Sequence, residues 1–418
     1  MSAITKLRAL VRVEIGKIMI RTGLILLVTI VLSCLTTMNA IGGITKKKNP
    51  DIALSVWPKN GFGYQTSAIN AFKAAIVENN GQFPDDIDEA IVTQAKKSFL
   101  SEPTAAGSVA LLALNENQAK REKLMISAQK LSKRELVSQT WSIYDSAERQ
   151  NVAQLLSYYD LSMRTSRTSS TALIPAIVSV IGQDGFAEPM VNLLKKNPPW
   201  AGQFWKQAAN NKAAIIYASK LRSSLDESQI DRSQLHDRDL VVNLVRNNHF
   251  EEVEELYSQS LSDKEGARGI THVARLDRQP LYPPLDWQLF STGKYFAFID
   301  TENRILNLSS TAGSNGVMAR QLLRINPGVY DLSLNIVADD LDIGSLRVSL
   351  TCAEPAAKND AVFAASLKSG ANINRLSISR DACRYFWLSI AVRADERVDG
   401  QDVAIDQIVL KPVKDSQL

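Results

Sequence analysis

Histidine and cysteine, which serve many enzymes as catalytic groups and metal ligands, are scarce in this 418-residue chain, with three of each. Its three histidines, His236, His249 and His272, show no ligand spacing, which argues against a zinc site or a histidine-based triad. No glycine-rich phosphate loop follows a strand pattern, and no G-x-S-x-G motif occurs. The carboxylates form no pair that spacing would nominate for glycoside hydrolysis. The sequence therefore predicts a protein that is not an enzyme.

A strong charge of either sign is also missing. The chain has 48 Lys and Arg residues against 44 Asp and Glu residues, spread along its length, for a formal net charge of +4. Nucleic-acid-binding proteins instead concentrate basic residues on one face or stripe. We expect no nucleic-acid partner.

Residues 22–45 contain no charged side chain, since no Asp, Glu, Lys or Arg occurs there. As a helix this stretch would span roughly 36 Å at about 1.5 Å per residue, enough to cross a hydrocarbon core of roughly 30 Å. We predict residues 22–45 as a transmembrane helix that holds the protein in the membrane, and residues 1–21 as a basic cytoplasmic N-terminus.

The flanks of this stretch bear on its orientation and processing. Basic residues are slightly more frequent before it than after it, which favours a cytoplasmic N-terminus. The ending Met38-Asn39-Ala40 lacks the small residue that ordinary cleavage needs two positions before Ala40. Val31-Leu32-Ser33-Cys34 resembles a bacterial lipobox, in which Cys34 would be lipidated, although Leu32 fits that pattern poorly. An uncleaved anchor, lipoprotein processing and ordinary cleavage stay open. All three place the bulk of the chain outside the cytoplasm, and we predict a single-pass protein of the bacterial inner membrane with that bulk in the periplasm.

Helical periodicity dominates residues 66–262, after a predicted connector at residues 46–65 that is rich in proline and glycine punctuation. An offset of 33 aligns Asn117-Gln118-Ala119 with Gln150-Asn151-Val152, a period typical of helical hairpin repeats. Residues 85–165 and 236–261 resemble degenerate tetratricopeptide-type repeats, although the Trp-Leu-Gly-Tyr signature is missing. The resemblance implies a scaffold that binds proteins. An irregular helical bundle is the alternative.

An aromatic cluster falls between the two repeat-like segments. Trp200 stands at a predicted helix entry, with Phe204 and Trp205 one turn further on. A core contact between adjacent helical hairpins explains this cluster better than a stacking site for a peptide or a glycan.

Short strand-like runs fill residues 285–414, after a predicted linker at residues 263–284. Turn residues separate these runs, as in an antiparallel sandwich. The predicted strands are 287–290, 295–299, 304–308, 317–324, 329–337, 346–352, 362–367, 374–379, 385–392 and 403–410. In the fifth of them, alternation predicts that Tyr330, Leu332, Leu334 and Ile336 point inward.

Two of the three cysteines stand at predicted strand ends. Cys352 closes one strand and Cys383 opens another, 31 residues later, which suits a bridge between the two ends. In an oxidising periplasm such a pair would form a disulfide. Two buried free thiols are the alternative.

Two strand motifs resemble those of jelly-roll carbohydrate-binding modules. They are the Gly-x-Tyr-x-Leu run at residues 328–332 and the Ile-Asp-x-Ile-x-Leu run at residues 405–410. The resemblance covers residues 285–413 and implies a jelly-roll sandwich. It also implies a structural calcium ion, the one cofactor expected here, at the positions that match the family's acidic residues, Asp286 and Asp406. A calcium site needs several oxygen ligands, and the sequence offers these two.

Aromatic side chains are the candidates for glycan contact in such a module, because sugar rings stack on them by their apolar faces. The candidates are Tyr295, Phe296, Tyr385 and Trp387. At least half of them must face the core, because they alternate along their strands.

The order of the parts resembles a family of bacterial envelope proteins associated with surface-polysaccharide production. The resemblance rests on the membrane segment, the helical repeats with a Pro-Pro-Trp segment, and a sandwich that begins Pro284-Leu285-Asp286-Trp287 and contains Cys352 and Cys383. It implies a noncatalytic accessory role.

These observations together predict a multidomain chain with a transmembrane helix, an all-α tetratricopeptide-like region and an all-β jelly-roll sandwich. The predicted function is that of a periplasmic scaffold or adaptor for exopolysaccharide or capsule assembly and export. Its expected partners are envelope polysaccharide-assembly proteins and polysaccharide. Two alternatives are a pure protein-assembly module that touches no sugar, and a carbohydrate-active enzyme whose carboxylates only the fold brings together.

Overall fold

The computed structural model describes residues 3–79, 84, 86–166, 169–225, 231–258, 271–337, 346–354, 361–381, 383–393 and 400–413, with the side chains of residues 3–18 and 232 excepted. The chain divides into two compact units, Met1–Ser166 and Arg167–Leu418. The second unit contains both the later helices and the sandwich.

The first element, α1, is one continuous helix from Ala3 to Thr45. Its part from Met19 to Thr45 is long and apolar enough to cross a membrane. Side chains such as Leu24 and Ile25 are exposed, as membrane-spanning helices expose apolar side chains to lipid. The predicted apolar helix is confirmed, and a single-pass anchor and a signal sequence both have this form.

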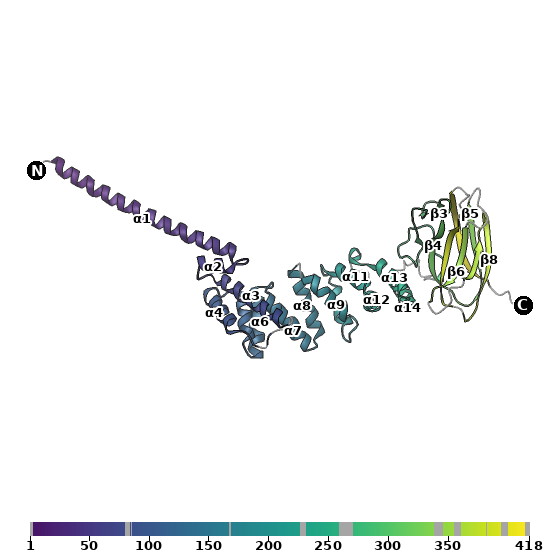
Figure 1. Cartoon of the computed structure of the whole chain (residues 1–418), viewed down its shortest axis with the longest axis horizontal. Helices are drawn as coiled ribbons and strands as arrows, with labels where there is room; N and C mark the ends of the chain where they lie inside the picture. The colour runs from purple at the N-terminus through teal and green to yellow at the C-terminus, as the bar shows by residue number, and fades with distance from the viewer. Residues whose placement is uncertain are drawn as a thin grey trace. The chain divides into compact units, whose positions relative to one another are not determined.

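Seven further helices complete the described part of the first unit (Figure 1). They are α2 Pro50–Val56, α3 Gly61–Glu78, α4 Glu89–Ser101, α5 Ala106–Leu114, α6 Gln118–Leu131, α7 Leu136–Glu148 and α8 Val152–Thr165. The predicted connector at residues 46–65 thus contains α2 and the start of α3. Pro50 suits the first position of α2, and the Asn60 side chain caps α3 by accepting a hydrogen bond from Gly63 N at 2.9 Å.

The pairs α5–α6 and α7–α8 are successive helical hairpins around a core that contains Met125 and Trp141. The second helix of each begins after an asparagine whose side chain caps it, Asn117 for α6 and Asn151 for α8. These caps fall, to within one residue, on the positions that the 33-residue offset aligns. The sequence repeat is therefore a repeat of helix starts, and a tetratricopeptide identity stays a prediction.

Helices α9 Ser169–Val180, α10 Ala187–Leu194, α11 Ala201–Ala209, α12 Ile215–Ser223, α13 Asp237–Arg246 and α14 Phe250–Leu256 open the second unit. Trp200, Phe204 and Trp205 are buried, with ring centroids 6.4 and 5.2 Å apart in edge contacts. The aromatic cluster is a core contact, as its spacing predicts.

The C-terminal region is an antiparallel sandwich of two five-stranded sheets (Figure 1). Sheet A has the order β1-β4-β9-β6-β7 and sheet B the order β2-β3-β10-β5-β8. The strands are β1 Gln288–Leu289, β2 Tyr295–Asp300, β3 Ile305–Ser310, β4 Asn315–Arg324, β5 Gly328–Val337, β6 Leu346–Cys352, β7 Ala361–Ser366, β8 Gly370–Ile378, β9 Tyr385–Arg393 and β10 Gln401–Pro412. Each predicted strand is present.

The core lies between the two sheets and is built by alternation. On β5, Leu332, Leu334 and Ile336 are buried and Tyr330 is half-buried, as predicted. The described part of the predicted linker, residues 271–284, packs on this sandwich. The Trp287 indole donates to Ala274 O at 3.1 Å, and the buried Gln321 amide donates to His272 O at 3.1 Å. These bonds hold the segment that carries Pro284 against β4.

Candidate binding site on the outer face of sheet A

Strands β4 and β9 present one row of side chains to the core and the other to the outer face of sheet A. The register pairs Arg324 with Tyr385 and Leu322 with Trp387. Their chain neighbours Leu323 and Phe386 belong to the core, so the two pairs point outward. The outer face thus carries arginine and aromatic side chains on adjacent strands.

Helices α13 and α14 lie over this face, and two local features fix their place. Arg222 on α12 forms a buried bidentate ion pair with Asp237 in the first turn of α13, with N···O distances of 2.9 and 3.0 Å. Asn248, just after α13, takes the left-handed conformation with φ of 64°, which asparagine tolerates better than most residues. This turn ends α13 and starts α14 at Phe250.

Part of the face is covered by α14. The Phe250 ring stacks on the Tyr385 ring, with centroids 5.1 Å apart and an interplanar angle of 26°. The Glu254 carboxylate accepts hydrogen bonds from Arg324 Nη1 at 2.6 Å and from the Tyr385 hydroxyl at 2.8 Å. At the rim, Arg384 pairs with Glu251 at 2.8 Å. An aromatic ring and a carboxylate of the chain itself therefore occupy this part.

These contacts shift the pKa values of the groups involved. Burial and the hydrogen bond to Glu254 raise the pKa of the Tyr385 hydroxyl well above its ordinary value. The hydrogen bond and the charge of Glu254 raise the pKa of Arg324. Tyr385 stays protonated and Arg324 charged at neutral pH, and Glu254 accepts from both.

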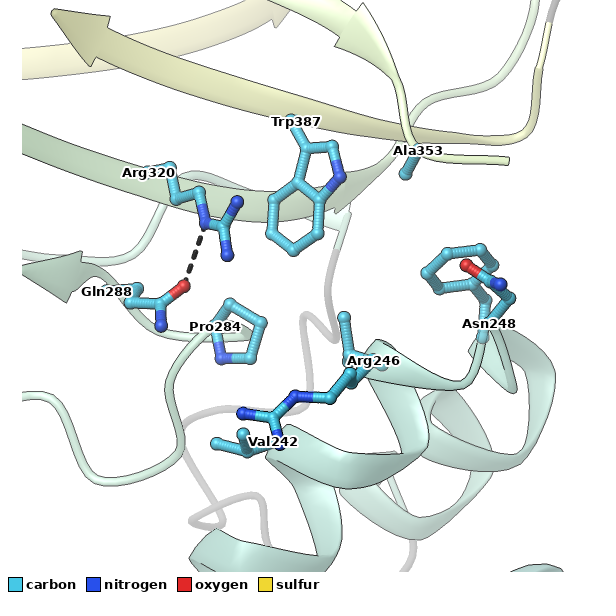
Figure 2. A pocket seen from close by; sticks show the side chains of 10 residues that line it. Val242, Arg246, Asn248, Pro284, Gln288, Arg320, Ala353 and Trp387 are labelled. Carbon is cyan, nitrogen blue, oxygen red and sulfur yellow. Dashed lines mark hydrogen bonds between the residues drawn. The ribbon is translucent and has the colours of Figure 1, made fainter. Parts of the chain in front are cut away.

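The remainder of the face is open and forms a cavity of about 240 Å³. Figure 2 shows Arg320 and Trp387 of the sandwich on one side and α13 with Arg246 on the other. The lining residues are Val242, Val245, Arg246, Asn248, Phe250, Pro284, Gln288, Arg320, Ala353 and Trp387. The cavity therefore combines an indole ring, two guanidinium groups and two carboxamides with apolar walls.

Arg320 is the half-buried charge of this cavity. Its guanidinium carbon lies 4.3 Å from the Trp387 ring centroid and 5.3 Å from that of Phe290, and its Nε donates to Gln288 Oε1 at 2.8 Å (Figure 2). Burial lowers the pKa of Arg320. No carboxylate in the described part of the chain lies within ion-pair distance of it. The described lining residues therefore carry two positive charges, those of Arg320 and Arg246, and no negative one.

A disulfide between Cys352 and Cys383, with Cα atoms 5.8 Å apart, borders the cavity. The predicted pairing is confirmed. Next to it, Ala353 N donates to Tyr385 O at 2.9 Å, and Glu354 accepts from the backbone N–H groups of Arg384 and Tyr385. The bridge thus ties the end of β6 to the start of β9, the strand that carries Trp387. The one group of three potential metal ligands among the described residues is Cys352, Glu354 and Cys383, and its sulfur atoms belong to the bridge.

The four predicted glycan-contact residues lie in different places. Trp387 lines the cavity, and Tyr385 is buried under α14 on the same face. Tyr295 packs against the core, where a Cβ atom at Gly316 would lie 2.6 Å from its hydroxyl oxygen. Phe296 is 46% exposed on the outer face of sheet B. The structure therefore brings Tyr385 and Trp387 together and separates the other two from them.

The two predicted calcium ligands have different surroundings. Asp286 is buried, and its carboxylate accepts from Leu281 N and Tyr282 N at 3.0 and 2.9 Å and pairs with Arg278 at 3.3 Å. Asp406 is exposed on β10 and accepts from Asn335 Nδ2 at 2.9 Å. Neither belongs to the group of three potential ligands described above. Asp286 already has the partners that a buried carboxylate needs, and calcium binding stays a prediction.

Cys34, the predicted lipidation site, is an exposed residue inside α1. The helix continues past it to Thr45. Lipidation at this position stays a prediction.

The sequence reasoning missed Arg320, Arg246, Gln288 and Asn248, which stand on three separate segments around the cavity. Arg320 carries a partial signal, because alternation places it on the same face as Arg324. Phe298 was also missed. Its spacing of two residues from Phe296 puts both rings on one face of β2, where their centroids lie 6.0 Å apart.

Comparison with known proteins gives distant likenesses. The CBM4 structure is 11% identical over 29% of this chain and 77% of that one, with a TM-score of 0.23. The structure of TmCBM61 in complex with β-1,4-galactotriose is 8% identical over 32% of this chain and 99% of that one, with a TM-score of 0.22. The Glycosylation Associate Protein complex from Streptococcus agalactiae is 14% identical over 34% of this chain and 44% of that one, with a TM-score of 0.24. At these TM-scores the likenesses say nothing of this chain's ligands. No protein-family model and no curated protein matches the sequence.

Proposed function

We propose that this chain is a noncatalytic binding protein of the bacterial envelope, held by α1 in the inner membrane with its bulk in the periplasm. In this proposal it supports the assembly or export of a surface polysaccharide. The helical region contacts partner proteins of the assembly, and the outer face of sheet A binds glycan. The observation that carries the proposal is the cavity that Trp387 and Arg320 share with α13.

The lining of the cavity has the chemistry of a sugar-binding site. An indole ring offers a flat apolar surface to the C–H groups of a sugar ring, and guanidinium and carboxamide groups hydrogen-bond hydroxyls. Binding sites for small ligands are commonly apolar, with a few placed polar groups of this kind. The volume of about 240 Å³ is below the roughly 300 Å³ at which pockets for drug-sized ligands begin. The cavity suits one saccharide unit of a longer chain.

Binding without catalysis is supported by what the cavity lining lacks. Glycoside hydrolysis commonly needs two carboxyl groups that flank the scissile bond. None of the ten described lining residues is an Asp or a Glu, and none is a His, Cys or Ser. Three carboxylates of the described residues near the cavity have partners: Glu251 pairs with Arg384, Glu254 pairs with Arg324, and Glu354 accepts from the backbone N–H groups of Arg384 and Tyr385.

The periplasmic location is supported by the disulfide and by α1. Disulfides persist in oxidising compartments, and the bacterial periplasm is one of them. A reporter that is active only in the periplasm, fused after Leu418, should be active in cells. An inactive fusion, together with fluorescence from a cytoplasmic reporter at the same position, would contradict the orientation.

The glycan part is tested with the full chain in detergent, probed on a glycan array that includes polysaccharide from bacterial envelopes. We expect binding, and we expect Trp387→Ala to weaken it at least about 10-fold, because aromatic contacts dominate the energy of binding sites. Phe298→Ala is the matched control on sheet B and should leave binding unchanged. Trp387→Phe, which keeps an aromatic ring, distinguishes lost stacking from lost folding. If no glycan on the array binds, the glycan-binding part of the proposal is wrong.

A pure protein-assembly module is the competing candidate, and one observation favours it. Phe296 and Phe298 are 46% and 48% exposed on the outer face of sheet B and stack on one another. Paired exposed aromatic rings are typical of protein interfaces. Under this candidate, Phe298→Ala would release copurifying envelope proteins from the full chain, and no glycan would bind.

A further inference from the structure

The outer face of sheet A carries two arginine–aromatic pairs of similar construction. Arg324 and Tyr385, which lie directly opposite each other in the register, form the first pair. Arg320 and Trp387 form the second pair, in which Arg320 lies opposite Ser389 and contacts Trp387 diagonally. In each pair, the arginine of β4 contacts the aromatic side chain of β9 or shares a partner with it. The two pairs can therefore be compared as potential sites on one surface.

The first pair shows what this arrangement binds. The Glu254 carboxylate accepts from Arg324 Nη1 at 2.6 Å and from the Tyr385 hydroxyl at 2.8 Å, while Phe250 lies over the Tyr385 ring at 5.1 Å. A carboxylate and a flat apolar ring, both supplied by α14, occupy the pair together. An acidic sugar combines the same two elements in one unit, a carboxylate and a ring with an apolar face.

The second pair has no such occupant among the described residues. Arg320 makes a hydrogen bond to a neutral carboxamide and contacts two aromatic rings, but no described carboxylate pairs with it. Arg246 approaches the same cavity from α13, with Asn243 Oδ1 at 3.3 Å as its neutral partner. A half-buried guanidinium without a counter-ion is costly, and an anionic ligand removes that cost.

We propose that the cavity binds an acidic sugar. The carboxylate of the sugar pairs with Arg320, as the carboxylate of Glu254 pairs with Arg324. Trp387 then contacts the sugar ring, and Arg246 adds a second positive charge from α13. The inference rests on the proposed function, because it specifies the class of glycan that the same site takes.

The neighbouring pair, which holds the Glu254 carboxylate, favours a carboxylate over a phosphate or a sulfate. The Nε of Arg320 is already engaged with Gln288, so its remaining donors are the two Nη groups. A carboxylate carries one charge and two oxygen atoms in one plane, which matches a guanidinium edge. The neighbouring pair already binds a carboxylate in the same chain.

The experiment measures binding of the full chain in detergent by calorimetry at low ionic strength. The probes are oligosaccharides of galacturonate, of mannuronate and of glucuronate, each beside its methyl ester, which keeps the ring and removes the charge. We expect at least one acid form to bind 10-fold or more tightly than its ester. Arg320→Gln should abolish that difference, and Arg320→Lys should keep part of it.

The matched control is Arg375→Gln, which removes the same charge from an exposed arginine on sheet B that pairs with Asp331. This variant should keep the full preference for the acid form. Melting temperatures of all variants show whether they fold.

Four outcomes would overturn the inference. In the first, the acid and ester forms bind equally, and in the second, no uronate probe binds although a neutral glycan does. In the third, the preference for the acid form survives Arg320→Gln. In the fourth, equimolar phosphate or sulfate displaces the acid form. In the first two cases glycan binding stands and only the inference fails. If no acidic, esterified or neutral glycan binds, the proposed function fails as well.

Discussion

The outer face of sheet A has a covered part and an open part, built from the same strands. In the covered part, Arg324 and Tyr385 meet Glu254 and Phe250 of α14. In the open part, Arg320 and Trp387 line a cavity with α13. The difference lies in what the helices place above each pair, since β4 and β9 supply an arginine and an aromatic ring to both. The covered part is therefore the basis of our proposal for what the open part binds.

The largest expected effect on this comparison comes from Phe250→Ala. Phe250 is buried, stacks on Tyr385 and also lines the cavity, so its loss would open the covered part toward the cavity. We expect the free energy of unfolding to fall by about 3 kcal/mol, since truncation of buried phenylalanines commonly costs this much. Urea denaturation of the full chain in detergent, followed by circular dichroism, measures the change.

The matched control for that variant is Phe298→Ala, the same truncation at a residue that is 48% exposed on sheet B. It should cost less than about 1 kcal/mol, because little buried area is lost. Equal losses for the two variants would mean that α14 does not depend on the Phe250 stack for its position.

A smaller effect is expected for Glu254→Gln, which removes the charge between Arg324 and Tyr385. Charge-assisted hydrogen bonds contribute more than neutral ones, and we expect a loss of about 1.5 kcal/mol in the same denaturation experiment. Glu251→Gln on the same helix is the control. The Glu251–Arg384 pair is exposed, with 71% and 58% of the side chains accessible, so its loss should cost less than about 0.5 kcal/mol. Equal costs would show that the covered part has no special carboxylate site.

The smallest expected effect is a pH dependence that originates at Tyr385. Its pKa is raised in the folded protein, so the folded state holds this proton more tightly than the unfolded state does. The stabilisation is complete below the unfolded tyrosine pKa of about 10 and is lost as the pH rises from there toward the folded-state pKa. At pH 7 we expect Tyr385→Phe to cost about 1 kcal/mol, the net value of one hydrogen bond.

The difference between wild type and Tyr385→Phe should therefore narrow above about pH 10. Measuring the difference at each pH cancels the titration of the other tyrosines and of the lysines. A difference that stays constant from pH 7 to pH 11 would contradict the assignment of this dependence to Tyr385.

Several features of the fold could be predicted because they depend on local patterns. The apolar stretch at residues 22–45 is long and apolar enough to cross a membrane by its own composition, and α1 contains it. The strands follow from alternation and turn residues, and the bridge between Cys352 and Cys383 follows from their places at strand ends. The Trp200 cluster proved to be core, as expected for aromatic rings one helical turn apart.

The site residues were harder to predict, because the same local sequence pattern is compatible with several tertiary environments. Tyr385 and Trp387 alternate with Phe386, so the sequence places the two on one face of β9, but it does not say which of the two α14 covers. Asp286 precedes a strand, at the position where the jelly-roll resemblance implies a calcium ligand. In the structure, its carboxylate accepts hydrogen bonds from the backbone N–H groups of Leu281 and Tyr282.

Sequence patterns were sufficient to predict the apolar helix, the helical region, the succession of strands and the disulfide, since each of these depends on neighbours in the chain or on the places of residues at strand ends. The position of the candidate binding site, in contrast, depends on tertiary contacts. Arg246, Gln288, Arg320 and Trp387 meet through the register of β1, β4 and β9 and through the docking of α13 and α14. The surroundings of a side chain such as Arg320 depend on segments that are distant in the chain, and these segments bring no carboxylate of the described residues within ion-pair distance of it.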